Sequence, residues 1–190
     1  MVASEERMCP YHREERDMEK QSWYAIRTLH NKASVVRTIA QHEHVECYTP
    51  QREVEEVVDG EVRLHRIDIM PSLLFLYTTP SFIGRLRVAT NDNILPYSEP
   101  GTTKLYAIAD AEMERFRFVA RTAATTIEPI DGSTLDATAR VRITGGIFRG
   151  MEGHIKRVHG TKRFVVSIEG VAAIATTYIP KEYIEKITLN

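Results

Sequence analysis

The stretch Ser72-Leu-Leu-Phe-Leu-Tyr-Thr78 decides the fold of this chain. Five consecutive apolar or aromatic residues lie between two hydroxyl side chains, and Pro71 punctuates the entry to the run. A strand that is buried on both faces has such a continuous apolar pattern, whereas a strand with one solvated face alternates. The stretch therefore predicts a central strand with a neighbour on each side.

Upstream of this strand, the sequence predicts a first strand and a helix. Residues 22–28 are rich in aromatic and β-branched residues, which favour a strand. Asn31 is expected to cap a helix whose apolar residues recur at helical spacing and which ends near His44. Residues 45–49 are then expected to be extended.

A hairpin is expected between this region and the central strand. Asp59-Gly60 separates the extended residues 51–58 from residues 61–69, and Asp-Gly suits the positive φ angles of a tight turn. The first arm is acidic and the second is basic, which favours cross-strand ion pairs. The alternation of the second arm slips at His65, which predicts a bulge.

Two further helices are expected downstream of the central strand. Pro80-Ser81 opens the first, and Asp110 caps the second, which presents Met113, Phe116 and Val119 on one face. The order of these elements predicts an α+β fold in which an antiparallel sheet is flanked by helices.

The pattern changes after Arg121. Residues 122–138 are rich in Ala, Thr, Asp, Pro and Gly without a sustained period, which is typical of a linker. Beyond them, glycine-rich turns separate short strands, and such a chain of about 50 residues favours a small β-barrel. The five predicted strands comprise residues 140–144, 154–158, 163–168, 172–178 and 183–187.

The first 21 residues are highly charged and contain no Leu, Ile, Phe or Trp, so we expect a flexible extension there. The predicted organisation is therefore an extension (residues 1–21), an α+β domain (22–121), a linker (122–138) and a small barrel domain (139–190).

The net charge of −1 over 190 residues conceals a basic segment. Residues 140–163 contain seven Lys or Arg residues against the single acidic residue Glu152, and aromatic side chains such as Phe148 lie among them. A basic face on a small barrel suits nucleic acid or an acidic protein surface, while a merely solvated face is the equally weighted alternative.

Several classes of protein are not indicated. The chain begins without an apolar signal peptide, and its apolar runs are far shorter than the roughly 20 residues of a membrane span. Cys9 and Cys47 are too few for a disulfide framework. The sequence thus predicts a soluble, cytoplasmic protein without a membrane partner.

No motif recommends an enzyme, a cofactor or a metal. Gly145 and Gly150 have the spacing of a phosphate-binding loop, but Met151-Glu152 stands where Lys-Ser/Thr is required. The histidines and cysteine of residues 42–47, like those of residues 9–12, do not supply four zinc ligands at finger-like spacing. An unrecognised enzyme remains one alternative, and bound metal would favour it.

A family resemblance adds to these expectations. The segments Trp23-Tyr-Ala-Ile-Arg-Thr28, Cys47-Tyr-Thr-Pro50 and Met70-Pro-Ser-Leu-Leu-Phe-Leu76 resemble the N-terminal domain of NusG transcription elongation factors. The tail from Val141 to Ile155 looks like a KOW motif, an SH3-like barrel that follows in the same family. More narrowly, residues 143–153 and 165–173 resemble UpxY-type paralogues, antiterminators of capsular polysaccharide operons.

The resemblance implies a non-enzymatic antitermination or elongation factor. The N-terminal domain would dock on the clamp of RNA polymerase near the upstream edge of the bubble and bias it against pausing or termination. The residues implied at the docking depression are Trp23, Tyr24, Met70, Pro71, Leu73 and Phe75.

The KOW domain has other partners in the family, namely a small-subunit ribosomal protein and the termination factor Rho. The basic segment instead favours nascent leader RNA, and non-template DNA is a further candidate partner. A ribosome-associated or RNA-binding KOW protein is the alternative function. The residues expected to meet nucleic acid or a partner are Arg27, Arg142, Phe148, Arg149, Lys156, Arg157, Lys162 and Arg163.

Overall fold

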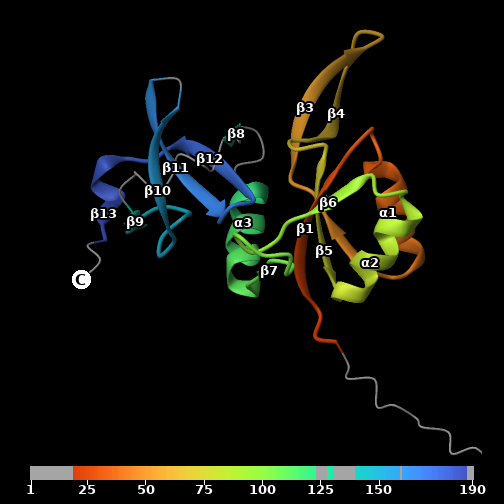
Figure 1. The fold of residues 1–190 in the computed structure, drawn as a ribbon. Coiled ribbons are helices and arrows are strands. Elements are labelled where there is room, and N and C mark those ends of the chain that lie inside the picture. Colours follow the sequence, from red (N-terminus) through yellow and green to blue (C-terminus); the bar gives the residue numbers. More distant parts are fainter. Residues whose placement is uncertain (1–18, 123–127, 131–139, 159, 188–190) are drawn as a thin grey trace, which may run out of the picture.

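The computed structural model describes residues 19–122, 128–130, 140–158 and 160–187 (Figure 1). The expected extension therefore lies almost wholly outside the described residues, as does most of the expected linker. In the described part of the chain, no helix is long and apolar enough to cross a membrane.

The first sheet is built around β5 (Leu73–Thr78). Its strand order is β2-β5-β1-β6, where β2 is Glu46–Tyr48, β1 is Ser22–Thr28 and β6 is Ile94–Pro96. The short β7 (Ala107–Ile108) also pairs with β1, and all pairs are antiparallel. The prediction of a central strand is confirmed, since β5 has a neighbour on each side.

Helices cover both faces of this sheet (Figure 1). α1 (Ala33–His42) and α2 (Pro80–Ala89) lie on one face, and α3 (Asp110–Thr122) lies on the other. Side chains of a strand alternate between the faces, so Leu74 and Leu76 pack in the α1 and α2 core while Phe75 packs toward α3. This arrangement confirms the predicted α+β architecture.

The helix starts differ from the expectation at Asn31 and at Asp110, which is the first residue of α3 and not the residue that caps it. Asn31 does not cap α1, because it has a left-handed φ of 56° and Lys32 precedes the first helical residue without a side-chain cap. His30 and Asn31 instead form a tight turn from β1 into the helix. Thr79 does cap α2, since its hydroxyl accepts a hydrogen bond from the Phe82 amide.

The predicted hairpin consists of β3 (Gln51–Val58) and β4 (Glu61–Asp68), and it projects from the body of the molecule (Figure 1). Asp59 and Gly60 form its turn, with φ angles of 54° and 82°. Arg66 pairs with Glu53 across the strands at 3.1 Å, as expected.

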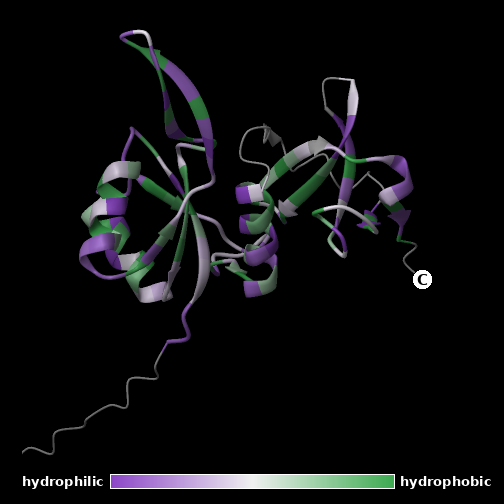
Figure 2. Ribbon diagram, turned by 180° about the vertical axis from the view of Figure 1, so that it is seen from behind, coloured by the Kyte–Doolittle hydropathy of each residue, from purple (hydrophilic) through white to green (hydrophobic). Residues whose placement is uncertain are grey.

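The predicted bulge at His65 is wrong, because the register runs without a break from Gln51–Asp68 to Val58–Glu61. Figure 2 shows that polar and apolar residues follow each other irregularly along the projecting ribbon. Among the described residues, none of the hydrophobic core clusters includes a residue of this hairpin, so its apolar residues do not have to alternate with the pleat.

The second sheet, here called the C-terminal sheet, has the strand order β13-β9-β10-β11-β12-β8. The five predicted strands are all present. A sixth, β8, lies inside the expected linker and pairs with β12. The bounds are Glu128–Ile130 for β8, Arg140–Ile143 for β9, Glu152–Val158 for β10, Thr161–Ile168 for β11, Ala172–Tyr178 for β12 and Ile184–Lys186 for β13, with a 3-10 turn at Lys181–Tyr183.

Phe75 gives a direct test of the core. Its ring is fully buried and lies 5.5 Å from the ring of Phe116, so Phe75→Ala removes a packed aromatic without a polar substitute. We expect a loss of about 3–5 kcal/mol in the free energy of unfolding, measured by urea denaturation. Val88→Ala, at a residue that is 78% exposed on α2, is the control and should change stability little. A loss under about 1 kcal/mol for Phe75→Ala would contradict this packing.

Candidate functional site

Helix α3 lies between the two sheets and contacts both (Figure 1). On one side, Phe116 packs against Phe75 of β5 with ring centroids 5.5 Å apart. On the other side, Phe118 meets the edge of Phe148 at 6.3 Å and an angle of 88°. The helix carries acidic residues in its first turn and Arg121 in its last, which suits the helix dipole.

The contact between α3 and the C-terminal sheet is both apolar and polar. Phe148 also packs against Phe164, and one continuous hydrophobic cluster runs from the first sheet through α3 into the C-terminal sheet. At the start of the helix, the Glu112 carboxylate accepts a hydrogen bond from the Glu169 amide at 3.1 Å. In this arrangement the two sheets share one buried core.

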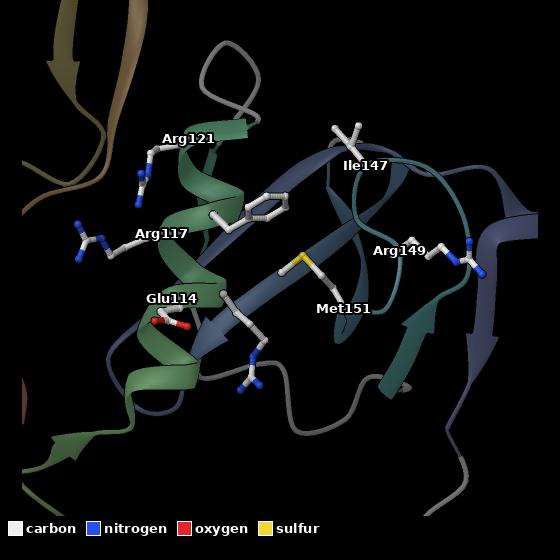
Figure 3. Close-up of a pocket in the computed structure, with 8 residues that line it drawn as sticks. Glu114, Arg117, Arg121, Ile147, Arg149 and Met151 are labelled. Atoms are coloured by element: carbon white, nitrogen blue, oxygen red, sulfur yellow. The ribbon is translucent and has the colours of Figure 1, made fainter.

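An open cavity of about 810 Å³ lies beside this contact (Figure 3). Phe118 and Ile147 form part of its lining and are 46% and 68% exposed, and Met151 lies with them. Figure 3 shows Arg117 and Arg121 extending from α3 away from Met151 and toward the hairpin side. The cavity therefore offers an apolar patch beside arginine side chains, a composition that suits a protein or nucleic-acid partner.

The residues predicted to face the polymerase divide into buried and accessible ones. Trp23, Leu73 and Phe75 all belong to the core on the α3 face of the first sheet, each at most 6% exposed. Tyr24 is equally buried but lies in the core on the opposite face, because it alternates with Trp23 along β1. The structure thus does not bring Tyr24 together with the other five.

The accessible members are Met70 and Pro71, which precede β5. Met70 is half-buried against the α3-side core and Pro71 is exposed. These two residues form a rim at the end of the apolar strand.

The sequence did not predict a further layer of side chains on the α3 face of the first sheet, which is formed by Tyr48 and Arg117. The Arg117 guanidinium lies over the rings of both Trp23 and Tyr48, at 5.3 Å and 5.0 Å from their centroids. It also donates to Glu46 at 2.8 Å. Burial raises the pKa of the Tyr48 phenol to about 12, although Arg117 and Arg121 act in the opposite direction. Residues 23, 48 and 117 are too far apart in sequence for periodicity to connect them.

The predicted basic residues of the C-terminal sheet fall into two groups. Arg140 and Arg142 both pair with Glu152, at 3.3 Å and 2.7 Å. The hydrogen bond from Arg142 lowers the pKa of the Glu152 carboxyl, so this acid stays ionised. Glu152 therefore offsets much of the charge that the sequence placed on this part of the sheet.

The second group gathers on the β10–β11 hairpin. Lys156 stands opposite Arg163, and Arg157 stands opposite Lys162. Arg157 and Lys162 are exposed, while Lys156 and Arg163 are half-buried. Like charges directly opposite each other destabilise a strand pair, so the exposed Arg157–Lys162 pair makes this hairpin a candidate surface for a polyanion.

The remaining predicted contact residues differ in exposure. Phe148 is 2% exposed and belongs to the core, so it offers no surface ring for a nucleic-acid base in this arrangement. Arg149 and Arg27 are exposed, and Arg27 lies on the same side of β1 as Trp23.

The glycine loop at residues 145–150 folds as a turn whose amides are used internally. The Gly150 amide donates to the Ile143 carbonyl at 2.7 Å, and the Arg149 amide donates to the Gly146 carbonyl at 3.2 Å. These donors therefore do not form a phosphate cradle. In the described part of the chain, no three His, Cys, Asp or Glu side chains are grouped as metal ligands.

Comparison with known proteins adds one match. Residues 21–117 match the family model described as "Transcription termination factor nusG". No curated protein matches the sequence.

Cys47, on β2, packs against the core on the α1 and α2 face of the first sheet and should react slowly. Burial raises the pKa of its thiol from 9.0 to about 11, so its thiolate fraction at pH 8 is small. In a Cys9→Ser background, we expect alkylation by iodoacetamide at pH 8 to be about a hundredfold slower than for the urea-unfolded chain, with the difference shrinking as the pH approaches 11. Equal rates in the folded and unfolded chains would show that β2 does not shield the thiol.

Proposed function

Because the chain belongs to the NusG family of transcription factors, we propose that it binds RNA polymerase and suppresses pausing or termination. The match over residues 21–117 carries this proposal, because it covers the first sheet, the hairpin and most of α3. NusG-family proteins generally bind RNA polymerase. The proposed action consists of binding and not of bond chemistry, and it would take place in the cytoplasm.

The mechanism we propose is a shift of a conformational equilibrium. A factor that binds the elongating state of the polymerase more tightly than the paused state favours elongation by that difference in affinity. The clamp is the proposed docking partner. Met70 and Pro71 would contact it at the rim, while Trp23, Leu73 and Phe75 would support the surface from the core.

We further propose that the C-terminal sheet is an SH3-like KOW domain and that the protein serves particular operons, as UpxY-type paralogues do. The strands at residues 140–186 and the tight glycine turns between them support the first part. Operon choice would come from the nucleic acid that the β10–β11 hairpin contacts, nascent leader RNA in the first place. A small-subunit ribosomal protein and Rho remain predictions for the same domain.

Co-purification tests the proposed partner. We expect the full chain, tagged and isolated from its native host, to bring down RNA polymerase subunits. Met70→Asp should reduce their recovery, because it places a charge on the docking rim, whereas Val88→Asp on exposed α2 should not. Recovery of ribosomal subunits without polymerase would contradict the proposal and favour a ribosome-associated protein.

Salt dependence tests the proposed RNA contact. We expect the full chain to bind single-stranded leader RNA with an affinity that falls with salt, at a slope of about −0.7 per neutralised phosphate. The double variant Arg157→Gln/Lys162→Gln should reduce the magnitude of the slope by about 1.4, if each side chain neutralises one phosphate. The matched control is Arg85→Gln/Arg87→Gln on α2, which should keep the slope. An equal slope for wild type and the hairpin variant would contradict an RNA contact at this site.

A further inference from the structure

A second cavity, of about 650 Å³, lies at the base of the β3–β4 hairpin and faces the end of α3. Its lining includes five arginines from four elements: Arg37 of α1, Arg52 of β3, Arg66 of β4, and Arg117 and Arg121 of α3. These elements are far apart in sequence, so the fold itself gathers the guanidinium groups. Such a concentration of like charge needs compensation from carboxylates or from a ligand.

Three of these arginines are compensated within the protein. Arg37 pairs with Asp68, Arg66 pairs with Glu53 at 3.1 Å, and Arg117 pairs with Glu46 at 2.8 Å.

Arg52 and Arg121 are different, since neither forms an ion pair with any of the described residues. Both are exposed at the cavity. The five arginines and the three paired carboxylates leave two positive charges in excess.

Arg117 supplies a further unfilled donor. Its guanidinium lies over the rings of Trp23 and Tyr48, and one terminal nitrogen donates a hydrogen bond to Glu46. Its Nε, however, is buried without a hydrogen-bond acceptor among the described residues. A buried donor without a partner is costly, so an acceptor bound at this place would be favourable.

The donor set suits one kind of ligand. Guanidinium groups present rigid forks that match the oxygens of phosphate, and four such groups besides Arg117 line the cavity. We propose that this cavity binds a phosphate group, held by Arg52, Arg117 and Arg121. The site is distinct from the Met70–Pro71 rim and from the basic β10–β11 hairpin, so it goes beyond the proposed function.

The sole tryptophan provides the readout, because Trp23 lies directly against Arg117. Inorganic phosphate is titrated into the full chain at constant ionic strength, while Trp23 emission and the heat of binding are both measured. We expect saturable binding in the wild type. Arg52→Gln and Arg121→Gln should each weaken it by about tenfold or more, because each removes a hydrogen bond to a charged group.

Two control variants distinguish a specific phosphate site from nonspecific attraction by positive charge. Arg87→Gln, on α2 at the other face of the first sheet, removes the same charge and should leave binding unchanged. Arg121→Lys keeps the charge but not the fork, so its affinity should fall between those of the wild type and Arg121→Gln. All variants change exposed side chains, and their melting temperatures should match that of the wild type.

Titration with a single-stranded oligonucleotide distinguishes two sources of the bound phosphate group, a free phosphate-bearing molecule and a nucleic-acid backbone. Saturation by inorganic phosphate supports a site for a free phosphate-bearing molecule. Binding of the oligonucleotide alone, weakened by Arg52→Gln and Arg121→Gln but not by Arg87→Gln, supports a site for a backbone phosphate. The proposal is overturned if neither ligand binds, or if Arg87→Gln weakens binding as much as the cavity variants. Either outcome is independent of whether the chain binds polymerase.

Discussion

The packing of α3 against two sheets at once is the constraint on which the rest of the structure depends. Phe116 packs on Phe75 of the first sheet. Phe118, two residues later, packs on Phe148 in the C-terminal part of the chain. Successive residues of a helix point in different directions, so Phe116 and Phe118 can face the two sheets while Arg117 and Arg121 extend toward the hairpin side. Arg117 and Arg121 thereby reach the cavity at the base of the β3–β4 hairpin, where three arginines of other elements also lie.

The ion pairs between individual side chains, and not the net charge of the chain, determine how charge is distributed over this molecule. Glu152 offsets Arg140 and Arg142 on the C-terminal sheet, and Glu46, Glu53 and Asp68 offset three arginines around the cavity. The positive charge left unpaired within the described part of the chain includes Arg52 and Arg121 at the cavity beside the β3–β4 hairpin, while the exposed Arg157 and Lys162 face each other on the β10–β11 hairpin. A net charge near zero is thus compatible with two separate surfaces for anions.

Short-range sequence patterns predicted where the helices and strands lie, but they did not predict which side chains contact each other in the fold. The continuous apolar run of β5, the Asp59-Gly60 turn and the short C-terminal strands each carry their own signal within a few residues. The Trp23–Arg117–Tyr48 layer does not, because its members come from β1, β2 and α3, and no periodicity links them.

Two differences between the expectations from sequence and the structure have the same kind of origin. The apolar slip at His65 indicated a bulge only under the assumption that a core covers the hairpin, and the hairpin instead projects from the body. Phe148 was expected to meet a partner because basic residues surround it in sequence, yet its ring closes the contact with α3. Burial of a single aromatic depends on the fold around it and not on its sequence neighbours.

The most direct test of the proposed function is the dwell time of RNA polymerase at a defined pause site in a single-round transcription assay with the purified full chain. We predict a dwell time that shortens as the protein concentration rises and reaches a plateau when the polymerase is saturated. An unchanged dwell time at a concentration that saturates the polymerase would contradict the account.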